Sequence, residues 1–227
     1  MQDQTAQLTA QLTWREAQVP VSQRFDDPYF SLENGLAETR HTFLAGNGLP
    51  GRFRPGFHVA ELGFGTGLNL LATWQLWRQS GQGGRLYFTS FEAFPMALAD
   101  MARALAAFPE LQDLAQPVLA ALAETPTQVD LPDLHFSLIL GDARQTLPHW
   151  AGQADAWFLD GFSPAKNPEL WELPLLAAVH AHTAPGGSLA TYTAAGFVRR
   201  GLADVGFTVA RMPGYGRKRH MSVAKKG

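Results

Sequence analysis

Short apolar segments alternate with longer segments rich in Ala and Leu from residue 57 to the end of the sequence. The apolar segments predict strands at 57–62, 85–91, 135–140, 156–160, 188–193, 208–212 and 220–224. The segments between them predict helices at 68–80, 95–107, 111–123, 169–182 and 195–205. Because strands that alternate with helices form parallel sheets between helical layers, the pattern predicts an α/β fold with a parallel sheet.

The first 56 residues do not follow this alternation. Residues 8–14 have partial two-residue alternation, which favours a small hairpin or an edge strand. Residues 24–31 are rich in turn-forming residues, and residues 32–44 favour a short helix. We therefore expect an N-terminal extension or cap at 1–56, docked on a main domain at 57–227. Within that domain, the stretch 126–132 is expected to be a loop.

The composition is that of a globular protein, with 46% hydrophobic and 17% charged residues in 227. The net charge is only −2, but eight of the 18 Lys and Arg lie from Arg199 onward, together with one of the 20 Asp and Glu. A basic C-terminal region on an acidic body indicates contact with nucleic acid.

Cysteine is absent from the sequence, which excludes disulfides, thiolate metal ligands and cysteine nucleophiles. The first residues are polar, unlike a secretory signal, and no apolar run approaches the roughly 20 residues that span a bilayer. These features predict a soluble cytoplasmic protein without a membrane partner.

A glycine-rich turn follows the first predicted strand. Gly63, Gly65 and Gly67 stand between that strand and the next predicted helix. Glycine lets the backbone turn sharply and approach a ligand, and a helix N-terminus offers free N–H groups. The spacing G-x-G-x-G differs from the G-x-G-x-x-G of dinucleotide-binding proteins. With Glu61 ahead of it, the turn suits a ligand with an amino-acid group, whose ammonium can meet this carboxylate or bound water near it. The alternative is a purely structural turn.

Acidic residues follow the next two predicted strands. At the end of the second strand, the Glu92 carboxylate can accept hydrogen bonds from both hydroxyls of a ribose. At the end of the third, Asp142 can accept one from the exocyclic amine of adenine. Each residue alone is equally well explained as a solvated side chain or part of an ordinary turn. Because parallel strand ends meet at one edge of the sheet, acids at three successive strand ends together predict a nucleoside pocket.

The fourth predicted strand leads to Asp160 and the loop DGFSPAKNPELW. Its two prolines restrict the backbone, so that the loop can hold Phe162, Lys166 and Asn167 as a substrate platform. The alternatives are a stiff connection in which Asp160 caps the next element, and packing as the role of Phe162. Motifs of other chemistries are absent: there is no G-x-S-x-G elbow, no phosphate-binding loop and no H-x-x-x-H pair, so no metal site is expected.

Five ordered segments carry a resemblance to a known family: ELGFGTGLN (61–69), SFEAFP (90–95), DAWFLDGFSPAKNPELW (155–171), TAAGFVRRGL (193–202) and GYGRKRHM (214–221). They resemble the methyltransferase module of the bacterial tRNA wobble-uridine enzyme MnmC, whose stand-alone forms are called MnmD. The segment PVSQRFDDPYFSLENGLAETRHTFL (20–44) also fits this family. The resemblance therefore runs from about Val19 to Met221.

The resemblance implies a Rossmann-like class I methyltransferase that depends on S-adenosylmethionine (SAM), with a seven-stranded, mostly parallel sheet and helices on both faces. Its reaction would convert 5-aminomethyl-2-thiouridine at the tRNA wobble position to the 5-methylaminomethyl form. In the bifunctional relatives, an FAD-dependent domain makes the aminomethyl precursor. Since this sequence has no second glycine fingerprint, no FAD is expected, and a separate oxidoreductase would have to supply the precursor. The oligomeric state is left open.

Carried over by position, the resemblance assigns these side chains and turns to SAM: Glu61, Gly63, Phe64, Gly65, Thr66, Gly67 and Asn69 to its methionine part, Glu92 and Ala93 to its ribose, and Asp142 and Ala143 to its adenine. Asp160 would be the catalytic residue, facing the sulfonium and the incoming amine, either as a base or as an orienting group. The charge pattern adds Arg199, Arg200, Arg217, Lys218 and Arg219 as candidates for binding the tRNA backbone. Lys225 and Lys226 are expected to be solvated.

Two other functions stay open on the sequence alone. One is a SAM-dependent methyltransferase that acts on a different amine, on a protein or a small molecule. The other is a noncatalytic, methyltransferase-like fold that binds RNA. An intact loop around Asp160 speaks against the second.

Overall fold

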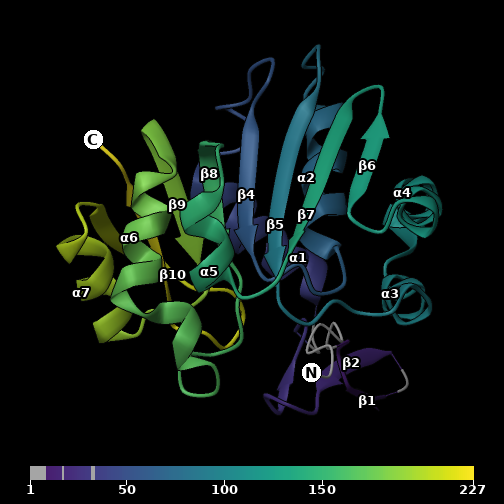
Figure 1. The fold of residues 1–227 in the computed structure, drawn as a ribbon, viewed down its shortest axis with the longest axis horizontal. Coiled ribbons are helices and arrows are strands. Elements are labelled where there is room, and N and C mark those ends of the chain that lie inside the picture. The colour runs from purple at the N-terminus through teal and green to yellow at the C-terminus, as the bar shows by residue number, and fades with distance from the viewer. Residues whose placement is uncertain (1–8, 17, 32–33) are drawn as a thin grey trace, which may run out of the picture.

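The computed structural model describes residues 9–16, 18–31 and 34–227. Within these residues the main sheet has eight strands: β4 (His58–Leu62), β5 (Leu86–Glu92), β6 (Gln128–Leu131), β7 (Leu134–Leu140), β8 (Ala154–Leu159), β9 (Thr183–Thr191), β10 (Thr208–Pro213) and β11 (His220–Lys225). Their spatial order is β10–β11–β9–β8–β4–β5–β7–β6. Neighbours from β9 to β7 pair in parallel, and antiparallel pairs lie at the two edges (Figure 1). The predicted α/β fold with a mostly parallel sheet is confirmed.

The strand count differs from the predicted seven because β6 occupies most of the stretch 126–132, which the sequence analysis assigned to a loop. β6 pairs antiparallel with β7 in a tight hairpin. Val129 is fully buried, while Gln128 and Asp130 on either side of it are exposed. This alternation is typical of an edge strand, but over four residues flanked by Pro126 and Pro132 it is too short to recognise.

Helices cover both faces of the sheet. One core contains side chains of α2 (Leu68–Gln79), α3 (Leu98–Leu105) and α4 (Gln112–Glu124), and the other contains those of α5 (Ala143–Thr146), α6 (Leu173–Ala181) and α7 (Gly196–Asp204). β8 contributes to both, because successive strand side chains point to opposite faces. Ala156 and Phe158 enter the first core, and Trp157 and Leu159 enter the second.

The helix predicted at 169–182 is split in two. A 3-10 turn (Pro168–Trp171) comes first, and α6 begins only at Leu173. Proline has no backbone N–H and is tolerated in a helix mainly in the first turn. Pro168 and Pro174 therefore each start a separate element, and Pro109–Leu111 and Leu147–His149 form similar short 3-10 turns.

The N-terminal region contains a small antiparallel sheet of β1 (Leu12–Arg15), β2 (Val19–Ser22) and β3 (Asp27–Pro28). After it, α1 (Gly35–Thr39) continues as a π-helical turn (Arg40–Leu44) and a 3-10 turn (Ala45–Asn47). The small hairpin or edge strand predicted at 8–14 is found only from Leu12 onward, and the helix predicted at 32–44 is found from Gly35, while residues 8, 32 and 33 lie outside the described residues. Leu36, Phe43 and Leu44 belong to the same core as α2, so this helical part packs as a layer of the main domain.

Chain order places the ligand edge of the sheet. From β4 the chain proceeds through α2 to β5 on one side, whereas β8 flanks β4 on the other. Open α/β sheets bind ligands at the carboxyl ends of strands around such a switch point. Figure 1 shows the small β1–β2 sheet lying at this same end of the molecule, beyond the tips of β4 and β5. Among the described residues, no helix has the length and apolar character to cross a membrane.

Candidate functional site

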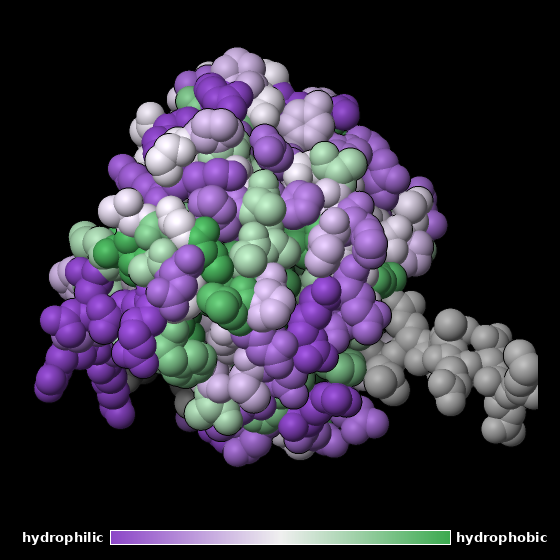
Figure 2. All heavy atoms as spheres, turned by 60° about the vertical axis from the view of Figure 1, so that its left-hand side comes forward, coloured by the Kyte–Doolittle hydropathy of each residue, from purple (hydrophilic) through white to green (hydrophobic). Residues whose placement is uncertain are grey.

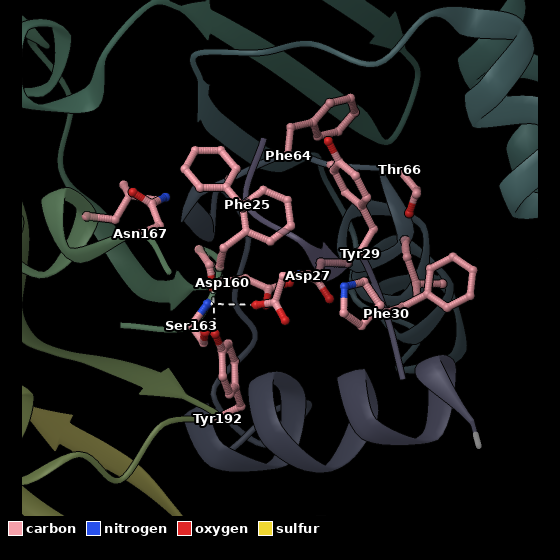
Figure 3. A pocket seen from close by; sticks show the side chains of 18 of the residues that line it. Phe25, Asp27, Tyr29, Phe30, Phe64, Thr66, Asp160, Ser163, Asn167 and Tyr192 are labelled. Carbon is pink, nitrogen blue, oxygen red and sulfur yellow. Dashed lines mark hydrogen bonds between the residues drawn. The ribbon is translucent and has the colours of Figure 1, made fainter. Parts of the chain in front are cut away.

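A cavity of about 620 Å³ opens at the carboxyl edge of the sheet (Figure 3). One side, here called the sheet wall, comes from the strand ends and turns at 63–69, 91–94 and 141–144. The opposite side, the cap wall, comes from residues within 24–31, 35–39, 161–170 and 215–218 and from Tyr192. Asp160 lies at the end of β8, between the two walls.

The glycine turn brings two strand ends into close approach. Gly63, Gly65 and Gly67 have φ of +89°, +55° and +79°, a region that favours glycine. A Cβ on Gly63 would lie 2.8 Å from the backbone oxygen of Asp160, so a side chain there would push β4 and β8 apart. Gly67 is the N-cap of α2 and does not line the cavity, whereas Gly65 does. The turn therefore leaves bare backbone facing the cavity beside Asp160.

Glu92 organises this turn. One carboxylate oxygen accepts hydrogen bonds from the backbone N–H of Phe64 (3.0 Å) and Gly65 (3.1 Å), and the other accepts one from Phe94 (2.8 Å). A carboxylate has about four acceptor positions, so capacity for a ribose hydroxyl remains. The side chain lines the cavity, next to Ala93. Its role at a ribose stays a prediction.

Asn69 stands between the buried carboxyl group of Glu61 and the partly buried one of Asp160. Its Nδ2 donates to Glu61 Oε1 (2.8 Å) and to Asp160 Oδ2 (2.6 Å), and its Oδ1 accepts from Thr39 Oγ1 (2.8 Å). Since the amide has two N–H bonds and both are used, its orientation is fixed by all three partners. Thr39 donates to the only oxygen of the amide, and this keeps the Nδ2 side toward the carboxyl groups.

Glu61 differs from the expectation for it. The side chain is fully buried behind Asn69, accepts a hydrogen bond from Ser90 Oγ (2.6 Å) and does not line the cavity. Glu61 therefore does not face a ligand's ammonium directly, and a contact through bound water stays a prediction. On the central strand β4, Glu61 pairs in register with Ser90 of β5 and Phe158 of β8. Its side chain binds Ser90 and Asn69 and does not reach the cavity.

The electrostatics single out Asp160. Burial raises the pKa of its carboxyl group to about 7, although the Asn69 hydrogen bond and the nearby Lys218 ammonium both lower it. Burial also raises the pKa of Glu61 well above its ordinary value. A carboxyl group with a pKa near neutrality can take up or release a proton at physiological pH, which is the property of a general base.

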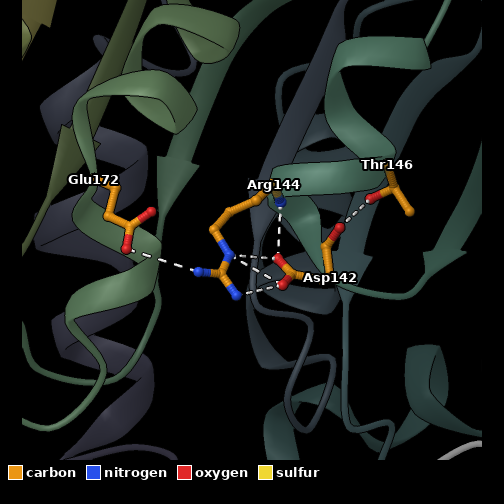
Figure 4. Close-up of polar contacts among 4 residues, drawn as sticks. All are labelled: Asp142, Arg144, Thr146 and Glu172. Atoms are coloured by element: carbon orange, nitrogen blue, oxygen red, sulfur yellow. Dashed lines mark hydrogen bonds and ion pairs between the residues drawn. The ribbon is translucent and has the colours of Figure 1, made fainter.

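Asp142 is paired within the chain. Its Oδ1 accepts from the backbone N–H of Arg144 (2.9 Å), and the Arg144 guanidinium folds back onto both oxygens at 2.6 to 3.1 Å (Figure 4). Arg144 Nη1 also lies 3.7 Å from Glu172 Oε1. The hydrogen bond from Arg144 lowers the pKa of Asp142 below its usual range, which keeps it ionised as an acceptor. Asp142 and Ala143 line the cavity, so an adenine contact there stays a prediction.

Two of the three residues predicted as a substrate platform on the loop after Asp160 line the cavity, and the third does not. Phe162 and Asn167 line the cavity, and Asn167 is buried. Lys166 does not line it: its Nζ contacts the backbone oxygen of Asp26 and lies 3.4 Å from Asp27 Oδ1. Lys166 therefore connects the loop to the N-terminal region, a tertiary contact that loop composition alone does not reveal.

The basic residues predicted to bind RNA also separate. Arg217 and Lys218 line the cavity, and Lys218 Nζ pairs with Glu38 Oε1 (2.5 Å) and lies 4.3 Å from the Tyr192 ring centroid. Arg219 adjoins this segment outside the lining, and Arg199 and Arg200 lie on α7 away from it. Figure 2 turns the side of α6 and α7 forward, and hydrophilic side chains predominate there around a smaller apolar area.

Lys226 corrects another expectation. Its Nζ donates to the backbone oxygens of His180 and Thr183, both at 2.8 Å, so it is anchored and not simply solvated. Lys225 is exposed, as predicted. Among the residues described by the structure, no three His, Cys, Asp or Glu side chains are grouped so that they could hold a metal ion.

The sequence analysis did not identify several side chains of the cap wall. Phe25, Tyr29 and Glu38 reach the cavity from the N-terminal region, and Tyr192 reaches it from beyond β9. Tyr192 Oη donates to the backbone oxygen of Gly161 (2.7 Å), which supports the residue next to Asp160. The only signal for Phe25 and Tyr29 was the aromatic character of the segment RFDDPYF, which carries no spacing rule of its own and does not include Glu38 or Tyr192.

Comparison with known proteins gives consistent results. The curated protein "tRNA 5-methylaminomethyl-2-thiouridine biosynthesis bifunctional protein MnmC" is 51% identical in Caulobacter vibrioides, over 92% of this chain and 36% of that protein. In Pseudomonas paraeruginosa it is 48% identical, over 93% of this chain and 34% of that protein. The chain thus spans about a third of the length of these relatives. The resemblance to MnmC inferred from the sequence is confirmed.

Solved structures support the fold. The crystal structure of MnmC2 from Aquifex aeolicus aligns with a TM-score of 0.77 at 25% identity, covering 97% of this chain and 71% of that chain. TrmN from Thermus thermophilus, at 19% identity and a TM-score of 0.54, covers 95% of this chain and 55% of its own and shares the fold. Residues 108–227, more than half of the chain, match the family described as S-adenosyl-L-methionine-dependent methyltransferase. The chain belongs to this methyltransferase family and uses SAM as its methyl donor.

Proposed function

We propose that this protein methylates the amine of 5-aminomethyl-2-thiouridine at the wobble position of tRNA, giving the 5-methylaminomethyl form. The names of the MnmC relatives, which match more than nine-tenths of the chain at 48 to 51% identity, support this substrate. The observation that carries the proposal is Asp160: a partly buried carboxyl group that lines the cavity, with a pKa of about 7, at the end of β8 beside the glycine turn.

The residues of the sheet wall fit SAM. The bare backbone at Gly63 and Gly65 would hold its methionine part, with Phe64 and Thr66 between them and Asn69 behind. Glu92 and Ala93 would hold the ribose, and Asp142 and Ala143 the adenine. Glu61 and Gly67 would act from outside the cavity, Glu61 through Asn69 and Gly67 by forming the turn.

The reaction would require the protein to position the amine against the methyl group and to accept one proton from it. When bound, SAM supplies a methyl group whose bond to sulfur breaks, leaving the electron pair on sulfur in S-adenosylhomocysteine. The substrate amine is protonated in water and cannot attack in that form. The Asp160 carboxylate would accept one proton from the ammonium, which frees the nitrogen lone pair for in-line attack, and the secondary ammonium product then leaves while Asp160 returns its proton to water.

Asn69 would aim the Asp160 carboxylate. With Nδ2 bound to Oδ2, the other oxygen of Asp160 stays available for the amine. Lys218, held by Glu38 and Tyr192, would set the charge around this oxygen. Arg199, Arg200 and Arg219 would contact the tRNA backbone outside the cavity and Arg217 at its lining, with Phe162 and Asn167 closer to the modified base.

Three further parts of the proposal concern context. The aminomethyl precursor would come from an oxidoreductase activity on another catalytic unit. The functional division would place the N-terminal cap at 1–56 and the methyltransferase domain at 57–227. The location would be the cytoplasm, where tRNA is modified.

The test is transfer of a labelled methyl group from SAM to purified tRNA that carries 5-aminomethyl-2-thiouridine. We expect label in the wobble nucleoside, and none in the same tRNA already carrying the 5-methylaminomethyl group. Label on protein or small amines but not on this tRNA would favour a different amine substrate. SAM binding without transfer to any of them would favour a noncatalytic role.

A further inference from the structure

Three aromatic side chains form a continuous cluster in the cap wall. The Phe25 and Phe162 rings stack with centroids 4.7 Å apart, and the Tyr29 ring meets Phe162 edge-on at 5.1 Å. All three line the cavity and are only partly buried. Figure 3 shows Phe25 and Tyr29 facing the same space as Asp160. Aromatic surface that stays partly exposed inside a cavity beside a reactive carboxyl group is available to a planar ligand.

The cluster is held together by a clamp between two distant parts of the chain. Asp27 Oδ2 accepts a hydrogen bond from the backbone N–H of Ser163 (3.0 Å), and Asp27 Oδ1 lies 3.4 Å from Lys166 Nζ. The clamp therefore fixes the N-terminal segment with Phe25 and Tyr29 against the loop with Phe162. This restraint holds the rings relative to one another, which lowers the entropy that binding must overcome.

Two cationic side chains lie near the cluster. The Arg24 guanidinium lies 5.7 Å from the ring centroid of Phe25 and 4.4 Å from that of Phe94. Lys218, which pairs with Glu38, lies over the Tyr192 ring. Both cations line the cavity. A ligand that combines a planar ring with phosphate groups would place the ring on the aromatic cluster and the phosphates toward these cations.

The adenine of SAM is a less suitable occupant. The acceptors for a nucleoside, Glu92 and Asp142, are on the sheet wall, which Tyr29 meets at Gly65 and Phe25 meets at Phe94. Phe162, which contacts both of these rings, lies on the loop that begins at Asp160, where the acceptor amine must arrive. The occupant is therefore on the acceptor side of the reaction.

We propose that Phe25, Tyr29 and Phe162 form a stacking surface for the target nucleobase, which leaves the stack of its RNA loop and lies against this cluster with its amine toward Asp160. Enzymes that act on a base in nucleic acid take it out of its stack and hold it against aromatic side chains. This inference rests on the proposed tRNA substrate and adds the residues that would select a planar ring.

The experiment is a thermodynamic cycle that removes the base and the ring separately. The probe is an anticodon stem–loop RNA whose wobble position carries either 5-aminomethyl-2-thiouridine or an abasic ribose, and its affinity is measured in the presence of S-adenosylhomocysteine. Wild-type protein should bind the abasic RNA about 5- to 100-fold more weakly, the scale of one base–aromatic stack. In Phe25→Leu and in Phe162→Leu, the intact RNA should bind more weakly while the abasic RNA binds nearly as to wild type.

Controls separate stacking from folding. Phe25→Tyr should keep wild-type discrimination between the two RNAs because it keeps the ring. Tyr87→Leu, an exposed aromatic near the start of β5 at the opposite edge of the sheet, should change neither affinity. The melting temperature and SAM affinity of each variant are measured alongside.

Two outcomes would overturn the stacking surface. If Phe25→Leu and Phe162→Leu lose as much affinity on base removal as wild type does, the base does not contact these rings. If they weaken SAM and leave the RNA unchanged, the cluster belongs to the cofactor. A failure of the proposed function is distinct from both, because wild-type protein would then transfer no methyl group to tRNA at all.

Discussion

The two walls of the cavity are built in different ways. The sheet wall consists of turns at neighbouring strand ends, where Glu92 binds the glycine turn of the adjacent strand and Asp142 binds Arg144 two residues away. The cap wall consists of side chains from segments more than a hundred residues apart. These are joined by long-range contacts, Asp27 with Ser163 and Lys218 with Glu38.

The difference separates what the fold provides from what this protein adds. Any sheet of this topology brings its strand ends and a helix N-terminus to the same place, so the sheet wall suits the methyl donor shared by the family. The cap wall depends on an N-terminal region and a proline-containing loop that are not required by the topology. We infer that acceptor specificity resides in the cap wall, and variants on each side test this division.

The largest effect is expected at Asp160, where the walls meet. Asp160→Asn keeps the shape and the contact with Asn69 but cannot accept the proton, so methyl transfer should fall by about 100-fold or more. SAM affinity should stay within a few-fold of wild type. Single-turnover transfer to tRNA, with SAM binding by calorimetry, measures both.

The matched control is Asp113→Asn on the exposed side of α4, which should leave both quantities unchanged. If Asp160→Asn transfers methyl groups at nearly the wild-type rate, then Asp160 is structural and the meeting point of the two walls has no chemical role.

A bulky residue at Gly65 should damage the sheet wall at its contact with Tyr29. The backbone there has φ +55°, and a Cβ would lie 3.1 Å from the Tyr29 ring, toward the cavity. Gly65→Leu should weaken SAM by at least about tenfold, a loss of roughly 1.4 kcal/mol in binding free energy. Gly81→Leu is the control, because Gly81 has φ +70° but open space around it, so it carries the same backbone strain. Equal SAM affinity in the two variants would remove Gly65 from the cofactor site.

Removing the Lys218 charge should shift the pH dependence without removing activity. Lys218 lowers the pKa of Asp160, whereas Glu38 raises it. Lys218→Met deletes the cation and leaves Glu38 in place, so the pKa of Asp160 should rise above about 7. The rate requires the carboxylate, so the rise of rate with pH should move to higher pH, by about one unit.

The single-turnover rate at saturating SAM and tRNA, followed from pH 6 to 9.5, measures this shift, with Lys225→Met on the exposed end of β11 as control. A shift to lower pH, or none, would mean that the cap wall does not influence the proton acceptor.

The sheet wall could be predicted from sequence because its signals are local. A strand, a glycine turn and a helix follow one another within 58–79, and each acid follows its own strand. Chain order and the carboxyl-edge rule then bring Gly65, Glu92, Asp142 and Asp160 together. All four of these residues line the cavity.

The remaining features depend on tertiary contacts between distant segments. Glu61 and Lys166 have the right residue types for ligand contacts, but burial of Glu61 behind Asn69 and the contacts of Lys166 with Asp26 and Asp27 direct them elsewhere. Phe25 and Tyr29 have no periodicity or spacing that marks them as lining residues. The edge strand β6 was missed for a related reason, since four residues give too little alternation.

The smallest expected effect concerns RNA contact outside both walls. Arg219 lies beside the cap wall without lining the cavity, and Arg199 and Arg200 lie on α7. If these arginines bind phosphates, each one replaced by Gln should weaken tRNA a few-fold. Because RNA binding with one phosphate contact fewer releases fewer counterions, the slope of log affinity against log salt should become shallower by about 0.7 to 0.9 per contact. SAM affinity should not change in any of them, because no proposed SAM contact is altered.

Filter binding of tRNA over a salt series measures the slope, with Lys225→Gln as control. A changed slope for Arg219→Gln but not for the α7 pair would confine RNA contact to the cap side of the molecule, whereas unchanged slopes for all three would place the RNA surface on the N-terminal region instead.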